Sequence, residues 1–203
     1  MAGQEAYSFG FTVGGGLLLQ EANLVSSLLE PGVESSTLAK RISDSNLLGQ
    51  RTQATGSRVS SELAKRFSNL TPDEVNFFIS AYYEDQTALL WVAACRTYKL
   101  LGEFATLIVR DKFLSLSTLL EPSDFESFLR QRALWSDEIS RLTDSTQYKL
   151  RQSTYLMLKE VGILSSENTI QQRELSPALL TLIRESNLPG LEYFTSHQIG
   201  SEG

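Results

Sequence analysis

The feature that most constrains the fold is a long apolar segment in the middle of the chain. Between residues 84 and 112, apolar side chains recur at helical spacing on more than one face, at Leu89, Val92, Ala93, Leu100, Phe104, Leu107 and Ile108. A helix that is apolar over most of its circumference has to be covered by other elements, so this segment is predicted to form the buried core. We expect one long helix, or a pair of helices broken near Gly102.

Signals that start and end helices are dense on both sides of this segment. In Thr71-Pro72-Asp73-Glu74, threonine is a cap, proline suits the first helical position and glutamate can reach back to the cap. Weaker signals predict further helices before residue 31, over 35–48, 57–69, 122–135, 136–142 and 146–161, and from residue 176 onward. A short β-hairpin is expected over 163–172. The pattern predicts an all-α, compact, multi-helix globular fold.

A domain boundary is predicted near Leu120, because Pro122 and a cap start a new helix there. Residues 1–120 would form an N-terminal helical domain, and residues 121–203 a C-terminal helical domain similar to a winged helix. The connection between them is not rich in glycine or serine, so we expect the two domains to pack together.

Several classes of protein are disfavoured by what the chain lacks. It contains one cysteine, Cys95, and one histidine, His197, so neither a disulfide within the chain nor a Cys/His metal site can form. The glycine run at residues 14–16 has no following Lys-Ser/Thr pair, as a phosphate-binding loop requires. We therefore expect no catalytic residue, no metal ligand, no cofactor and no enzyme activity. No apolar run approaches the ~20 residues of a membrane span, which favours a soluble, cytoplasmic protein without a membrane partner. We also expect a monomer.

The basic side chains are distributed unevenly. Residues 36–67 carry six basic and two acidic side chains, a net charge of +4, and residues 141–159 carry four basic and one acidic, a net charge of +3. The whole chain has a formal net charge of −6 and a pI near 4.9. This overall charge argues against a protein that coats nucleic acid with its entire surface, but it leaves room for two local basic patches.

The first basic segment has the pattern of a helix-turn-helix. On the helix predicted over 57–69, one face carries Val59, Leu63, Phe67 and Leu70, and the opposite face carries Arg58, Ser61 and Lys65. A recognition helix needs this division, with one side anchored and the other carrying donors for phosphates and bases. The candidate DNA contacts of this patch are Lys40, Arg41, Arg51, Arg58, Ser61, Lys65 and Arg66.

The second basic segment has the element order of a winged helix. A short helix, a polar turn and a longer helix precede the expected hairpin, with Asp144 or Ser145 as the cap of the longer helix. The inward stripe of that helix is Leu150, Thr154, Met157 and Val161, and its other side carries Tyr148, Gln152, Tyr155 and Lys159. The candidate DNA contacts of this patch are Arg141, Lys149, Arg151, Gln152 and Lys159.

Other interpretations of these segments stay open. Basic helix faces are commonly no more than solvated surface, where ion pairs contribute little. The patches, or a face formed by Tyr148 and Tyr155, could dock another protein, which would make the chain an assembly adaptor. A helical bundle that binds RNA, as in transcription antitermination factors, is a third class.

Several motifs resemble a known family. Tyr7-Ser8-Phe9 with Gly14-Gly15-Gly16-Leu17, the run Asn46–Thr52, and Leu90-Trp91-Val92-Ala93-Ala94-Cys95-Arg96 occur in the same order as in BrxA proteins, which belong to BREX bacteriophage-exclusion systems. Leu142–Thr146, Lys149–Gln152 and Leu158–Leu164 continue the pattern, and the resemblance extends to about Ile183. It implies a helical, non-catalytic component of phage defence that binds double-stranded DNA through helix-turn-helix elements and has other BREX proteins as further candidate partners.

Overall fold

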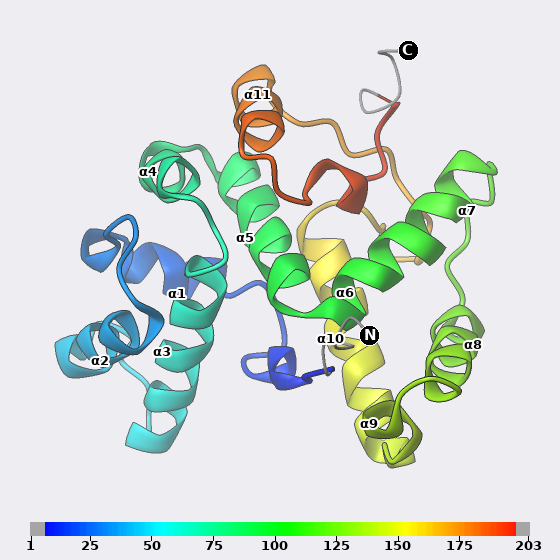
Figure 1. Ribbon diagram of the computed structural model, residues 1–203, viewed down its shortest axis with the longest axis horizontal. Coiled ribbons are helices and arrows are strands. Elements are labelled where there is room, and N and C mark those ends of the chain that lie inside the picture. The colour runs from blue at the N-terminus through cyan, green and yellow to red at the C-terminus, as the bar shows by residue number, and fades with distance from the viewer. Residues whose placement is uncertain (1–6, 198–203) are drawn as a thin grey trace, which may run out of the picture.

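The computed structural model describes residues 7–197, and a central pair of helices organises it (Figure 1). Helix α5 (Tyr83–Thr97) runs through the middle, and every side chain from Gln86 to Cys95 is buried. Helix α6 (Lys99–Phe104) continues through a π-helical turn, η3 (Ala105–Arg110), into α7 (Asp111–Leu114). The predicted buried core is confirmed for α5 and α6, whereas Leu107 in the π-helical turn is exposed.

The break between the central helices lies at Tyr98, one turn before the position expected from the sequence. Tyr98 has extended backbone angles, with φ −124° and ψ 99°, and this ends α5. Gly102 lies inside α6 instead. A Cβ atom at residue 102 would lie 3.1 Å from the carbonyl oxygen of Cys95 and 3.2 Å from the ring of Tyr193. The glycine therefore permits close packing, and the prediction of a break near it is wrong.

Most helices of the N-terminal half lie on one side of α5 (Figure 1). They are α1 (Leu19–Leu24), η2 (Ser26–Leu28), α2 (Ser35–Ser45), α3 (Gln53–Phe67) and α4 (Pro72–Ser80). The first turn, η1 (Gly10–Thr12), packs instead against α10 (Asp144–Glu160). Helix α2 packs along α3, and α3 packs on α5. Thr71 and Glu74 form the expected capping box at the start of α4, which confirms the strongest helix signal of the sequence.

The C-terminal half covers the other side of the central helices. Its elements are α8 (Pro122–Ala133), α9 (Asp137–Ser140), α10 (Asp144–Glu160), α11 (Pro177–Glu185) and η4 (Leu191–Tyr193). Helix α11 lies beside α4 at the upper edge in Figure 1. The chain then returns to the core, where the indole nitrogen of Trp91 donates to the carbonyl oxygen of Tyr193 at 3.0 Å.

The region expected to form a β-hairpin contains only isolated bridges. Leu164 pairs with Ile170, and Leu119 pairs with Thr169, both antiparallel. Within residues 7–197 no segment forms a β-strand. The chain does reverse over 163–172 as expected, but the pairing is too short to form a strand, so the wing is not confirmed.

Both halves contribute to one continuous hydrophobic core. Phe104 of α6 packs edge-on against Phe125 of α8, with ring centroids 5.0 Å apart. Leu150 and Met157 of α10 belong to the same cluster as the apolar residues of α3 and α5. The halves therefore pack together, while their division at residue 120 stays a prediction. Across the described part of the chain, no helix has the length and apolar character needed to cross a membrane.

Candidate nucleic-acid interface

Helix α3 has the two-sided character expected from its sequence. Val59, Leu63 and Phe67 are buried against the core, and Leu70 just beyond the helix is buried with them. Arg58, Ser61 and Lys65 are exposed on the opposite side. Thr52 caps the helix, because its hydroxyl accepts from the backbone amide of Thr55. The start of α3 therefore presents its free amides and its basic face to solvent.

Three exposed cations on or next to α3 are available to a ligand: Arg51 and Arg58 around its start, and Lys65 in its last turn. Arg51 and Arg58 are exposed, and neither forms an ion pair with any residue from 7 to 197. Lys65 is exposed at its tip, and its ammonium lies 4.5 Å from the centroid of the Tyr98 ring. A cation with no acidic partner keeps its full charge for a phosphate, so this cluster is the stronger part of the first patch.

Arg66 is not part of this surface, and its prediction as a DNA contact is wrong. Its side chain is 0% exposed, and its Nε lies 2.6 Å from the Oε1 of Glu62. Its Nη1 donates to the carbonyl oxygens of Gly16 and Leu17 at 3.0 and 3.2 Å. Arg66 therefore holds the glycine turn against α3, because burial of the guanidinium requires this set of partners.

The two cations of α2 are already paired. Lys40 lies 2.6 Å from Asp44 one turn later on the same helix, and Arg41 lies 2.7 Å from Glu30. All four side chains are exposed, so these pairs contribute little to stability and can exchange for a phosphate. We rank Lys40 and Arg41 below the cations of α3.

Helix α10 also begins at the surface. Thr143 caps it by accepting from the amide of Thr146, so the sequence-based choice of Asp144 or Ser145 as the cap is wrong. The expected inward stripe is confirmed, since Leu150, Thr154, Met157 and Val161 are all buried. The remaining faces of α10 are therefore free to carry polar side chains.

The second patch is smaller than the sequence suggested. Lys149 and Gln152 are exposed, and Lys149 has no ion pair within the described residues. Arg141 is exposed and lies 3.5 Å from Asp137, at the outer limit of an ion pair. These three residues form the accessible part of the patch.

The other two candidates of the second patch are engaged. Arg151 pairs with Glu126 of α8, and its guanidinium lies 5.3 Å from the ring centroid of Tyr148. The ammonium of Lys159 donates to the carbonyl oxygen of Ser166 at 3.0 Å, close to the end of the helix.

A surface formed by Tyr148 and Tyr155 does not exist. Tyr155 is buried, and its hydroxyl donates to the carbonyl oxygen of Glu121 at 2.6 Å. Burial is also the main reason why the pKa of this phenol is raised. Tyr148 alone is exposed, so the tyrosine face proposed for protein docking is wrong.

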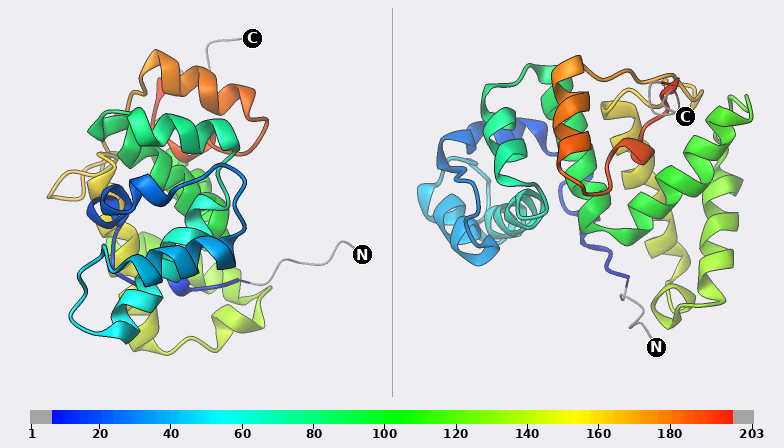
Figure 2. Two further views of the ribbon diagram at one scale, coloured as in Figure 1. Left: turned by 90° about the vertical axis from the view of Figure 1, so that its left-hand side faces the viewer. Right: turned by 45° about the horizontal axis from the view of Figure 1, so that its top comes forward.

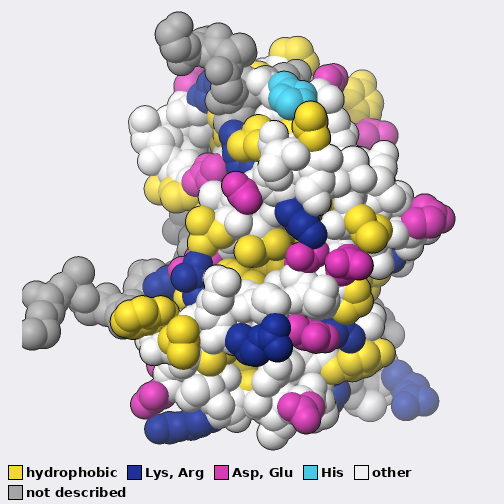
Figure 3. Space-filling view, turned by 90° about the vertical axis from the view of Figure 1, so that its right-hand side faces the viewer, with side chains coloured by type: hydrophobic (Ala, Val, Ile, Leu, Met, Phe, Trp, Pro, Cys, Tyr) yellow, Lys and Arg dark blue, Asp and Glu magenta, His cyan; other side chains and the backbone are white. Residues whose placement is uncertain are grey.

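The accessible cations near the starts of α3 and α10 lie towards one edge of the molecule, whereas Lys65 lies at the other end of α3. Helices α3 and α10 both begin at the lower edge in Figure 1, and the side view of Figure 2 shows the same arrangement. On the side that carries α7 and α8, by contrast, Lys and Arg are interspersed with Asp and Glu (Figure 3). Pairs on these elements include Lys112 with Asp124 and Arg132 with Glu103.

Two surface features near the second patch were not predicted from the sequence. Arg130 of α8 lines a groove of about 390 Å³ together with Tyr148 and Arg151 of α10. Leu134 and Trp135, between α8 and α9, are 76% and 74% exposed. The polar face of α8 could have indicated Arg130. The exposure of Trp135 could not be predicted, because it depends on how the segment between α8 and α9 packs.

The fold and the surface together define an all-helical protein with two exposed basic helices at one edge. The family model described as BrxA matches residues 5–187, and the chain belongs to that family. A relative from Paramagnetospirillum magneticum, "BREX protein BrxA", is 27% identical over 176 residues, covering 86% of this chain and 88% of the relative. A second, of the same description and from Bacillus cereus, is 25% identical over 166 residues, covering 82% of each chain.

A solved structure has the same fold. The crystal structure of an uncharacterized protein from Magnetospirillum magneticum superposes with a TM-score of 0.80 and 25% sequence identity. The match covers 95% of this chain and 99% of the other. The fold described above is thus shared along nearly the whole length of both proteins.

Proposed function

We propose that this chain is a non-catalytic component of a BREX phage-defence system that binds double-stranded DNA, mainly through phosphates. The observation that carries the proposal is a set of exposed cations that have no ion pair among residues 7–197: Arg51 and Arg58 around the start of α3, and Lys149 in the first half of α10. The names of the two BREX relatives support the cellular context. DNA has a high density of negative charge, and cations that neutralise its phosphates supply most of the affinity.

The positions of the cations support binding by helix ends. The first amides of a helix have no partner within the helix, and the helix dipole favours an anion there. Arg51 and Arg58 flank the start of α3, and Arg141 and Lys149 flank the start of α10. Amides and cations together therefore favour phosphate at both sites.

The helix-turn-helix assignment belongs to this proposal. Helix α2 packs along α3 and supports it, whereas the short α9 precedes α10 in the chain but packs mainly on α8. The connection between α2 and α3 spans residues 46–52, which is longer than the usual turn of three or four residues. We therefore assign phosphate contacts to these helices, and no base-specific contact.

Charge reversal tests the proposal. The variant Arg58→Glu with Lys65→Glu should lower affinity for a labelled non-specific duplex by at least tenfold, and so should Arg141→Glu with Lys149→Glu. The matched control is Arg184→Glu, an exposed arginine on α11 at the opposite edge, which should bind within twofold of the wild type. Equal affinity of all these proteins for the duplex would refute the proposal. If RNA of equal length displaces the labelled duplex, RNA becomes the proposed ligand in its place.

An assembly adaptor is a second candidate, favoured by one observation. Leu134 and Trp135 form an exposed apolar turn, and a large exposed tryptophan is typical of a protein-binding surface. The test is a pull-down from cells that carry the full defence system, with nuclease added. Other BREX proteins retained by the wild type, and lost with Trp135→Ala but not with Tyr82→Ala, would support the adaptor.

A further inference from the structure

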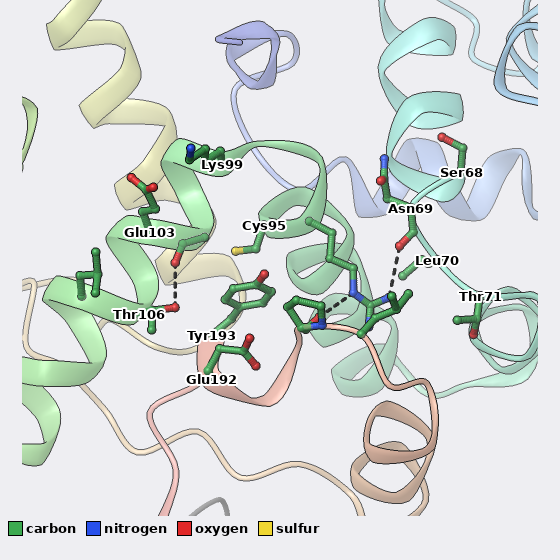
Figure 4. Close-up of a pocket in the computed structure, with 15 residues that line it drawn as sticks. Ser68, Asn69, Leu70, Thr71, Cys95, Lys99, Glu103, Thr106, Glu192 and Tyr193 are labelled. Atoms are coloured by element: carbon green, nitrogen blue, oxygen red, sulfur yellow. Dashed lines mark hydrogen bonds between the residues drawn. The ribbon is translucent and has the colours of Figure 1, made fainter. Parts of the chain in front are cut away.

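A cavity opens beyond the C-terminal end of α3, and none of the candidate DNA contacts lines it (Figure 4). It measures about 630 Å³ and lies between α6, the connection from α3 to α4, and the segment from Leu188 to Tyr193. Its walls are mainly apolar, with Leu70, Leu107 and Leu188 among them. This size and lining are typical of sites that take small organic molecules.

The charged residues of the cavity leave one cation and one anion without a partner. Arg96 is paired with the buried Glu74 at 2.6 Å, and Glu103 is paired with Arg132 at 2.9 Å.

Lys99 and Glu192 are the remaining pair of charges. Neither forms an ion pair within residues 7–197. One carboxylate oxygen of Glu192 accepts from the amide of Gly190 at 2.8 Å, and the ammonium of Lys99 lies 5.2 Å from the ring centroid of Tyr7. Both residues are half-buried, so their charges act through a medium that screens them less than bulk water does.

The hydroxyl of Tyr193 is the second observation that points to a ligand. Tyr193 is 9% exposed, and its ring lies against Gly102, where a Cβ atom would lie 3.5 Å from the hydroxyl oxygen. No residue from 7 to 197 is a hydrogen-bond partner of this hydroxyl, and its oxygen is not among the fully enclosed unpartnered atoms, so it is accessible at the cavity wall. Figure 4 shows the ring between Lys99 and Glu192, directed towards the buried thiol of Cys95. A hydroxyl can donate one hydrogen bond and accept others, so a polar atom of a ligand in the cavity has a partner here.

We propose that this cavity binds a small zwitterion with an apolar body, of the amino-acid class. The carboxylate of the ligand would accept from Lys99 and Tyr193, its ammonium would donate to Glu192, and its apolar part would lie against the leucines. The balance of one free cation and one free anion disfavours nucleotides and other polyanions, which need several uncompensated cations. The site does not involve the basic edge, so the inference does not depend on DNA binding.

The test uses the full-length ¹⁵N-labelled protein with L-phenylalanine and L-leucine as probes. Binding should shift the amide resonances of Gly102 and Tyr193 saturably. Phenylalaninamide, which lacks the carboxylate, and N-acetylphenylalanine, which lacks the ammonium, should each bind at least tenfold more weakly, because each loses a charge-assisted hydrogen bond. The spectra also report whether each variant is folded.

Variants separate the site from unspecific binding. Tyr193→Phe removes only the hydroxyl and should weaken binding roughly fivefold, while Lys99→Gln should weaken it at least tenfold. The matched control is Tyr82→Phe, because Tyr82 is exposed and lies outside the cavity. Three outcomes would overturn the proposal: no shift of Gly102 and Tyr193 with either probe, binding of the two blocked analogues as tight as that of L-phenylalanine, or unchanged affinity in both cavity variants.

Discussion

Arg66 gives the sharpest prediction about stability. In Arg66→Ala, the carboxylate of Glu62, which is 5% exposed, loses its cation, and the carbonyl oxygens of Gly16 and Leu17 lose their donor. Removing one partner of a buried ion pair typically costs about 3–5 kcal/mol. Since domains are stable by only about 5–15 kcal/mol, we expect a large fall in the urea midpoint.

A paired variant distinguishes a buried charge from simple loss of packing. In Arg66→Met combined with Glu62→Gln, no uncompensated charge remains, so the double variant should be more stable than Arg66→Met alone. One nitrogen of Arg66 is buried without a hydrogen-bond partner among the described residues, which makes the native pair less favourable than its geometry suggests. The exposed Arg58→Ala is the control and should change stability by less than about 0.5 kcal/mol. A loss below about 1 kcal/mol in Arg66→Ala would refute this reasoning.

Three further predictions concern buried thiol and phenol groups and a helix cap. Burial raises the pKa of Cys95 well above its ordinary value, so the thiol should resist a disulfide reagent at pH 8 until urea unfolds the protein; rapid reaction in the native state would contradict this. Thr143→Ala removes the cap of α10 and should lower unfolding free energy by about 1 kcal/mol, whereas Thr181→Ala on the exposed side of α11 should not. Burial also raises the pKa of four tyrosines. Their contribution to the free energy of unfolding is complete below the unfolded pKa near 10 and falls progressively as the pH rises above it, because the unfolded phenols ionise first. A free energy of unfolding that stays constant between pH 9 and 12 would contradict this. These tyrosines are Tyr7, Tyr98, Tyr155 and Tyr193.

Helix positions could be predicted from the sequence where signals between neighbouring residues determine them. The capping box of Thr71 and Glu74 needs only four consecutive residues, and the inward stripe of α10 follows from helical spacing alone. The opposite faces of α3 were found in the same way. Such features depend on neighbours along the chain, which a sequence shows directly.

Features that depend on distant segments did not follow. Arg66 lies on α3 at a spacing that could face solvent or core, and its burial is set by the glycine turn some 50 residues away in the sequence. Tyr155 is buried at the start of α8, where its hydroxyl donates to the carbonyl oxygen of Glu121. Residue 102 has no room for a side chain because the ring of Tyr193 packs against it. The cavity beside Tyr193 joins three separated segments, so no local pattern could have shown it.

The measurement that tests the central claim most directly is duplex affinity across a salt series. For the wild type, the logarithm of affinity should fall linearly with the logarithm of salt concentration, with a slope of about −0.9 for each phosphate neutralised. Arg58→Gln and Lys149→Gln should each reduce the magnitude of the slope by about 0.9, and the double variant by about twice that, if both helices contact one duplex. A wild-type affinity that does not depend on salt, or identical slopes in all four proteins, would contradict phosphate binding by this edge.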